Sequence, residues 1–150
     1  MTAIDLYTDG SSRGNPGPGG YGIVLKSGAH YKEINGGFAR TTNNRMELLA
    51  VIVGLEAIKR ENAQINVYSD SSYVVKAINE GWLKKWVTKG IDKQKNPDLW
   101  RRFLEIYPKH QVKFFWVKGH AGHPENERCD VLAVEAAMGT NLPVDAGMVE

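Results

Sequence analysis

Residues 4–20 read Ile-Asp-Leu-Tyr-Thr-Asp-Gly-Ser-Ser-Arg-Gly-Asn-Pro-Gly-Pro-Gly-Gly, a short apolar run followed by glycine and proline. Strand-favouring residues at the start of this segment predict a buried strand, and Asp9 comes where the strand gives way to turn residues. The glycines and prolines allow a tight, stiff loop whose backbone could approach a bulky anionic ligand closely. Because Asp-Gly is also an ordinary turn pair, Asp9 indicates a functional site only together with residues further along the chain.

The composition predicts one domain over residues 1–150, with a C-terminal tail at 139–150 that is either docked or frayed. The chain has 150 residues, of which 42% are apolar, enough for one core and too few for two. No segment approaches the roughly 18 apolar residues of a membrane span, and the N-terminus lacks a signal peptide. We therefore expect a soluble, cytoplasmic protein that does not associate with membranes. Cys129 is the single cysteine, which excludes an intrachain disulfide.

Basic residues are concentrated in one segment. Between residues 84 and 102, seven basic residues stand against two acidic ones, a local net charge of +5. Since the formal net charge of the chain is +2, the remainder carries −3. This asymmetry indicates contact with a polyanion at one place on the surface.

Hydrophobic periodicity predicts an α/β protein. Two strands follow the first loop, over residues 20–26 and 30–38, and the short links make the first three strands an antiparallel meander. The rest of the chain alternates between helices and strands, which calls for parallel strands in a mixed sheet with helices against its faces. The expected elements are a helix over 45–62, a strand over 65–68, a helix over 71–79, an irregular basic segment over 82–96 with at most one helical turn at its start, a helix over 99–107, a strand over 112–117 and a helix over 124–138.

Four acidic residues stand out by position, because Asp9 and Asp70 each follow a strand while Glu47 and Asp130 lie on helices. If the first and fourth strands are parallel neighbours, the first two acids share one edge of the sheet, and the helices can bring the others over it. Carboxylates so close repel one another unless cations are bound, and hard oxygen ligands favour Mg²⁺ or Mn²⁺ over zinc. Taken singly, Asp70 could cap a helix, Glu47 could complement a helix N-terminus, and Asp130 could be a surface residue.

Several longer motifs follow one another along the chain. They are Thr8-Asp9-Gly10-Ser11 with Gly14-Asn15-Pro16-Gly17, Thr41-Thr42-Asn43-Asn44-Arg45-Met46-Glu47-Leu48, Ser69-Asp70-Ser71, Trp116-Val117-Lys118-Gly119-His120, and Glu125-Asn126-Glu127 leading to Cys129-Asp130. In these motifs, and up to about Ala137, the chain resembles bacterial ribonuclease HI. The resemblance implies a five-stranded mixed sheet with helices on both faces, and an endonuclease that cuts the RNA strand of an RNA–DNA hybrid.

The resemblance also implies how the acids act. By position, Asp9, Glu47, Asp70 and Asp130 are the metal-binding carboxylates, with Asp9 bridging two Mg²⁺ ions for which Mn²⁺ is an alternative. In two-metal catalysis one ion activates the attacking water and the other stabilises the leaving 3′ oxygen. Cleavage should then leave 5′-phosphate and 3′-hydroxyl ends.

His120 matches the histidine of a flexible loop in the family, for which proton transfer or help in product release is the implied role. A satisfied structural histidine is the alternative that the residues by themselves favour. His120, His123 and Cys129 could also suggest zinc, yet three ligands without a fourth make a poor structural site.

Recognition of the hybrid requires groups that read a 2′-hydroxyl in the minor groove. The resemblance places Asn15, Asn43 and Asn44 in that role, with Thr42 near a phosphate of the DNA strand. Helix capping is the alternative role for residues 42–44, and the two roles can coexist.

A basic protrusion that grips the DNA strand is a further feature of the resemblance. Trp82 and Trp86 would share a helical face beside Lys84, Lys85 and Lys89. Two core tryptophans are the alternative. The segment departs from the family by being short, which leaves tight hybrid binding through it open. The chain has Val87, Thr88 and Ile91 at positions where basic or aromatic residues are more common in the family.

Two other classes of protein compete with this interpretation. An integrase or transposase core shares the scaffold, but such cores usually carry three acids and lack both the loop at 119–123 and the basic protrusion. A module that binds hybrids without cutting them would be indicated by a missing acid, and none is missing. We expect a monomer acting on RNA–DNA hybrid duplexes, and the sequence leaves recruitment by a single-strand-binding protein open.

Overall fold

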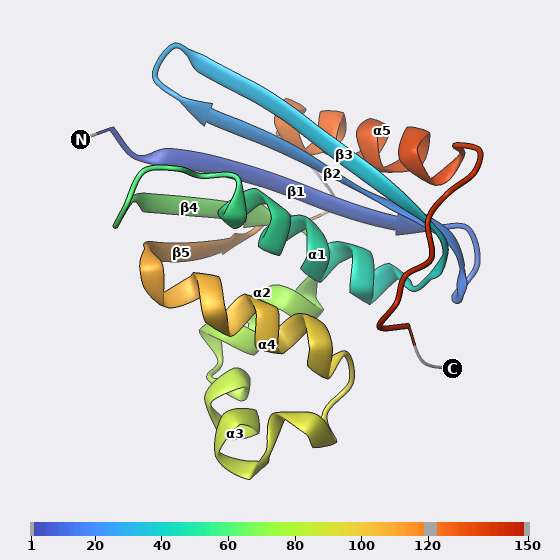
Figure 1. The fold of residues 1–150 in the computed structure, drawn as a ribbon. Helices are drawn as coiled ribbons and strands as arrows, with labels where there is room; N and C mark the ends of the chain where they lie inside the picture. The colour runs from blue at the N-terminus through green and yellow to red at the C-terminus, as the bar shows by residue number, and fades with distance from the viewer. Residues whose placement is uncertain (1, 119–122, 149–150) are drawn as a thin grey trace.

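The computed structural model describes residues 2–118 and 123–148. Figure 1 shows a twisted sheet with α5 on one side and the remaining labelled helices on the other. In chain order the elements are β1 (Ile4–Ser12), β2 (Gly17–Ser27), β3 (His30–Thr41), α1 (Asn43–Glu56), β4 (Gln64–Ser69), α2 (Ser72–Asn79), α3 (Trp82–Lys89), η1 (Ile91–Lys93), α4 (Pro97–Ile106), η2 (Tyr107–Lys109), β5 (Gln111–Trp116) and α5 (Pro124–Ala137).

The strands of the described residues form a five-stranded sheet in the order β3-β2-β1-β4-β5. β1, β2 and β3 pair antiparallel, as their short connections require, whereas β4 lies parallel to β1 and β5 parallel to β4. Between β1 and β4 the register runs from Ile4 facing Ile65 to Tyr7 facing Tyr68. The predicted mixed sheet is confirmed, and so is the parallel pairing of the first and fourth strands.

Helices bury the apolar side chains on both faces of the sheet. α1 packs against β1 and β2, and most of its residues are buried, as expected from apolar residues on nearly all its sides. α4 packs on α1 and contributes Trp100 and Phe103, both fully buried. α5 covers the opposite face over β1, β2 and β3. Within the described ranges, no helix combines the length and apolar character needed to cross a bilayer.

The glycine-rich stretch near the N-terminus is mostly strand rather than loop. β1 and β2 both extend into it, so that only residues 13–16 connect them. A Cβ on Gly20 would lie 2.4 Å from the carbonyl oxygen of Ala133, and a Cβ on Gly22 would lie 2.1 Å from that of Cys129. The expected loop is therefore confined to residues 13–16, and at Gly20, where the predicted strand over 20–26 begins, the missing side chain lets α5 pack directly on the sheet.

Two helices differ from their predicted bounds. α1 ends at Glu56, well before residue 62, and no glycine or proline marks this end in the sequence. The segment over 82–96, expected to be irregular beyond one helical turn at its start, contains the longer helix α3. One side of α3 is anchored by the buried Leu83 and the half-buried Trp86, while its lysines face solvent. The segment therefore forms an amphipathic helix, although its basic composition gives little indication of one.

A buried arginine docks the C-terminal segment. Arg45 of α1 is 2% exposed. Its guanidinium donates to Asp98 of α4 at 2.7 and 2.9 Å and to Asp145 at 2.8 and 3.0 Å. The Thr41 hydroxyl also donates to Asp145, at 2.7 Å. Of the two alternatives for the tail, its described residues therefore show docking.

Replacement of Asp145 by alanine should lower the free energy of unfolding by about 3 kcal/mol, because buried Arg45 then keeps only one carboxylate partner. Burial alone would raise the pKa of Asp145, but the hydrogen bonds from Arg45 and Thr41 outweigh it and hold the pKa below its usual value. The stabilisation should be fully present above about pH 4 and be lost as the pH falls through that lowered pKa. Urea unfolding of parent and variant across this range measures the difference.

Asp92→Ala is the control for this experiment. Asp92 pairs with Arg101 where both side chains are exposed, and exposed ion pairs contribute little to stability. Equal losses for Asp92→Ala and Asp145→Ala would contradict the structural role of the buried network.

Candidate active site

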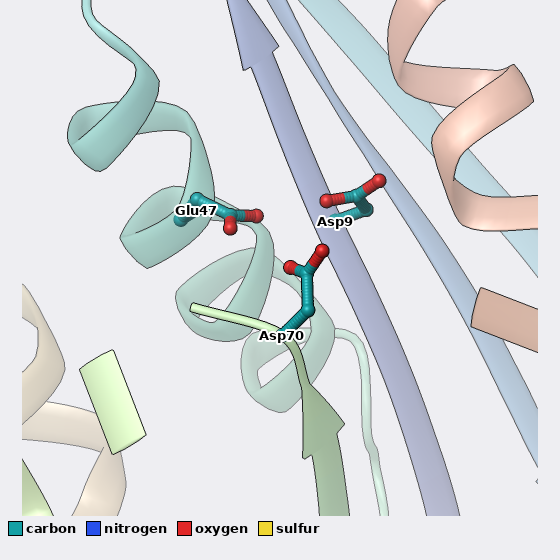
Figure 2. Close-up of side chains that lie close together, drawn as sticks. All are labelled: Asp9, Glu47 and Asp70. Carbon is teal, nitrogen blue, oxygen red and sulfur yellow. The ribbon is translucent and has the colours of Figure 1, made fainter. Parts of the chain in front are cut away.

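Three carboxylates meet at one edge of the sheet. Asp9 lies in β1, Glu47 in the second turn of α1, and Asp70 directly after β4. Each offers an oxygen atom within 4.8 Å of those offered by the other two. Figure 2 shows the three side chains converging from these elements. The structure thus brings together three of the four acids predicted to form a site.

Close packing of β1 against α1 sets the separation of Asp9 and Glu47. A Cβ on Gly10 would lie 2.3 Å from the backbone nitrogen of Glu47, so the strand can approach the helix only with glycine at this position. The Gly10 N–H donates to Asp9 Oδ1 at 2.9 Å and orients that carboxylate. The start of α1 is fixed by Thr42, whose hydroxyl oxygen accepts from the Arg45 N–H at 3.3 Å.

Asp70 is held through its backbone. At the end of β5, Trp116 donates its indole N–H to the Asp70 carbonyl at 3.1 Å. Ser69 Oγ accepts from the Ser71 N–H at 3.1 Å, and Ser71 in turn caps α2 by accepting from the Val74 N–H. The alternative that Asp70 caps this helix is therefore wrong, and its carboxylate is directed toward the other acids instead.

Glu47 shows the electrostatic cost of the cluster. Its side chain is buried, and its Oε1 accepts no hydrogen bond from the part of the chain that the structure describes. Burial, followed by the charges of Asp9 and Asp70, raises the pKa of Glu47 well above its usual value. Carboxylate oxygens are the ligands that Mg²⁺ and related cations prefer, and a bound cation would offset the repulsion. The three acids therefore fit a divalent-cation site.

The remaining candidate ligands lie apart from this cluster or outside the described residues. Asp130 is a solvent-exposed residue of α5 and is not among the clustered carboxylates. His120 lies outside the described residues. For the zinc alternative, His123 packs beside the Tyr68 ring, whereas Cys129 is buried. Burial raises the pKa of the Cys129 thiol, which disfavours the thiolate that zinc requires.

The residues predicted to read the substrate form one polar surface at the start of α1. Asn15 Oδ1 accepts from the Asn43 N–H at 3.0 Å, which ties the short loop to the helix. Asn15, Thr42 and Asn44 line a cavity of about 560 Å³ together with Gln94 of the basic segment. The capping alternative is confirmed for Thr42. Capping leaves Asn43 and Asn44 exposed, so both roles can coexist here.

The two tryptophans of α3 have different surroundings. Trp86 is half-buried and packs edge-on against Trp100, with ring centroids 5.5 Å apart. Trp82 is 38% exposed, so the alternative of two core tryptophans is wrong for this residue. Figure 1 shows that α3 lies at the end of the molecule away from the sheet. The exposed lysines of this helix are Lys84, Lys85 and Lys89.

Sequence reasoning assigns no role to two residues that hold this edge together. One is Trp116, and an aromatic residue at the end of a strand gives no particular signal. The other is Asn126 of α5, which is 1% exposed and donates to backbone carbonyls of β1 and β4. The sequence does contain a signal for Asn126: its helical spacing with Cys129 and Ala133 places a polar residue on the buried, apolar face of the helix.

Comparison with known proteins agrees with this architecture. The model of the RNase H family matches residues 1–138. The Ribonuclease H of Desulforamulus reducens is 60% identical over 150 residues, which covers 97% of this chain and 94% of the relative. The Ribonuclease H of Syntrophus aciditrophicus is 54% identical over 149 residues, covering 96% of this chain and 86% of the relative.

Solved structures give the same result. LC9-RNase H1, a type 1 RNase H with the type 2 active-site motif, is 31% identical with a TM-score of 0.82, over 91% of this chain and 72% of that one. LC11-RNase H1 in complex with an RNA/DNA hybrid is 27% identical with a TM-score of 0.61, over 89% and 96%. The strand order and the acidic edge define the class, an α/β protein with the ribonuclease H fold. Because the family model and these relatives span nearly the whole chain, the chain belongs to the RNase H family.

Glu47→Gln should stabilise the metal-free protein at about pH 8 by about 1–3 kcal/mol, since it removes a buried charge that has no compensating partner. The folded-state pKa of Glu47 is raised, so ionised Glu47 destabilises the fold above its unfolded-state pKa. The gain should shrink as the pH falls toward about 4, where Glu47 is protonated in both states. Urea unfolding in excess chelator at several pH values measures it.

Glu127→Gln provides the comparison, because Glu127 is an exposed residue of α5. It should show no such pH-dependent gain. A Glu47→Gln protein that is no more stable than the parent at high pH would mean that the cluster carries no such electrostatic cost.

Proposed function

We propose that this chain is an endonuclease that hydrolyses the RNA strand of RNA–DNA hybrids and leaves 5′-phosphate and 3′-hydroxyl ends. The observation that carries the proposal is the cluster of Asp9, Glu47 and Asp70 at the edge of a ribonuclease H fold. The hybrid bound to LC11-RNase H1 supports the choice of substrate. A cytoplasmic, monomeric enzyme remains the expectation from the sequence.

Asp9, Glu47 and Asp70 would hold the metal, which we propose to be two Mg²⁺ ions bound with the substrate, with Mn²⁺ as a substitute. The buried, unpaired Oε1 of Glu47 and the all-oxygen donor set favour such cations. When bound, the ions would supply an activated water and neutralise the charge on the leaving 3′ oxygen.

The chain's own groups have distinct tasks in this proposal. Asp9 lies in β1, which packs against both α1 and β4, and we propose that it would be shared by the two ions. The pKa of Glu47 is raised and metal binding requires the ionised carboxylate, so metal binding should weaken as the pH falls. Asp130 is proposed as a further metal ligand, as the family resemblance implies. His120 is proposed to transfer protons or assist product release.

Two surfaces beside the acids are proposed to bind the duplex. Exposed amides of Asn15, Asn43 and Asn44 can donate and accept hydrogen bonds at a 2′-hydroxyl, and Thr42 can contact a phosphate. On α3, the exposed lysines and Trp82 are suited to the DNA strand, because they place positive charge and an aromatic face together. The half-buried Trp86 would support that helix from below.

Asp70→Asn should abolish RNA cleavage while the fold persists. Loss of a direct ligand should cost more than the roughly 10–100-fold typical of residues behind the ligands. The assay incubates parent and variant with labelled RNA–DNA hybrid, double-stranded RNA and double-stranded DNA, in Mg²⁺ or in excess chelator. Only the parent with hybrid and Mg²⁺ should produce RNA fragments.

Asp5→Asn is the matched control for Asp70→Asn. Asp5 lies in β1 and accepts a hydrogen bond from Asn66, outside the clustered carboxylates, so cleavage should continue. Undiminished cleavage in chelator, or an Asp70→Asn enzyme as active as the parent, would refute the metal assignment.

Simultaneous replacement of Lys84, Lys85 and Lys89 by alanine should remove about three phosphate contacts. The slope of log affinity against log salt should then flatten by about 2 to 3 units. A raised KM with unchanged kcat is expected, because these contacts bind substrate and transition state alike. Cleavage of one hybrid across a salt series measures both quantities.

The control for the lysine variant replaces Lys32, Lys59 and Arg60 by alanine. These residues line one cavity near the first residues of β1, so the same charge is lost at a different place. Identical salt slopes for the two triple variants would show that α3 is a solvated basic helix without a special role in binding.

A further inference from the structure

The pairing of β1 with β4 ends two residues before Asp9 and two residues before Asp70. Their last register pair is Tyr7 with Tyr68, whose rings also stack with centroids 4.9 Å apart. Beyond this pair β1 continues beside β2, whereas β4 ends at Ser69. The β1–β4 ladder therefore stops fixing the distance between the strands just before Asp9 and Asp70.

Asn126 of α5 contacts both strands at the end of their pairing, the β1–β4 fork. Its Nδ2 donates to the Tyr68 carbonyl at 3.1 Å and to the Thr8 carbonyl at 3.5 Å. Thr8 directly precedes Asp9, and Tyr68 lies two residues before Asp70. A single amide group thus connects the two strands at the point from which they lead to the acids.

Burying this amide costs free energy, because one of its polar atoms has no hydrogen-bond partner among the described residues. Within the described residues, Asn126 Oδ1 and the Thr8 hydroxyl oxygen are both buried without a hydrogen-bond partner. An apolar side chain of similar shape would avoid the unpaired Oδ1, so packing alone does not account for an amide here. What the amide supplies, and an apolar side chain lacks, is the pair of hydrogen bonds to the two strands where their pairing ends.

We propose that Asn126 is a positioning residue that sets the separation of Asp9 and Asp70 and thereby the affinity of the cluster for its divalent cation. The inference rests on the proposed function, in which these acids bind metal. Asn126 acts through the backbone carbonyls behind two ligands. Residues behind metal ligands commonly change metal affinity by about 10–100-fold when they are replaced.

Asn126→Leu tests the proposal, because leucine keeps the branched shape of asparagine but has no N–H groups for the two carbonyls. Calorimetric titration of Mn²⁺ into the metal-free variant should show about tenfold weaker binding than in the parent. The Mg²⁺ concentration for half-maximal hybrid cleavage should rise by a similar factor. If Asn126→Leu does not fold, Asn126→Ser is used instead, because the short serine side chain cannot reach both strands. The same outcomes are expected for this variant.

Leu132→Ala is the matched control on the same helix. Leu132 is buried in α5 against Val24 and Cys129, so its truncation loosens α5 without touching the fork. This variant should lose thermal stability and keep the Mn²⁺ affinity of the parent. Unchanged Mn²⁺ affinity in the Asn126 variant, or equal weakening in both variants, overturns the positioning role. A parent that binds no Mn²⁺ and cleaves no hybrid overturns the proposed function and this inference with it.

Discussion

Mutual repulsion among Asp9, Glu47 and Asp70 is the constraint on which this edge of the molecule depends. Three carboxylates within 4.8 Å of one another do not assemble by their own attraction, so the surrounding fold must hold them. It does so with groups that leave the acids little freedom. Gly10 brings strand and helix backbones into contact, and Trp116 fixes the carbonyl of Asp70. The site is preorganised because these contacts hold the three carboxylates in place against their mutual repulsion.

The start of α1 connects the acids with the rest of the molecule. Thr42 begins the helix, Arg45 ties it to α4 and to the C-terminal segment, and Glu47 reaches the cluster. The cavity beside it is lined both by the amides near residue 15 and by the end of the basic segment. The first two turns of α1 therefore link the acidic cluster, the polar surface and the basic segment that contains α3.

The sequence was sufficient for the mixed sheet, for most of the helices and for placing Asp9 and Asp70 at one edge of the sheet, because periodicity and position after a strand are local signals. It failed where distant segments decide the structure. Gly17 and Gly19 resemble loop residues, yet they pair with β3 as part of β2. The basic segment indicates one helical turn at most, yet it holds the longer helix α3, whose Trp86 packs on Trp100. The tail shows no periodicity, and its docking depends on a partner in α1. Asn126 is marked only by its place on an apolar helix face.

The Arg45 network also has a consequence for the order in which the molecule forms. Arg45 and Asp98 are separated by 53 positions in the chain, and Arg45 and Asp145 by 100. Closing loops of that length costs conformational entropy before the contact is gained, so we expect the pair with Asp145 to form late, after the local hairpins and helices. The first turn of α1 then reaches its final geometry only when segments far apart in the chain have met.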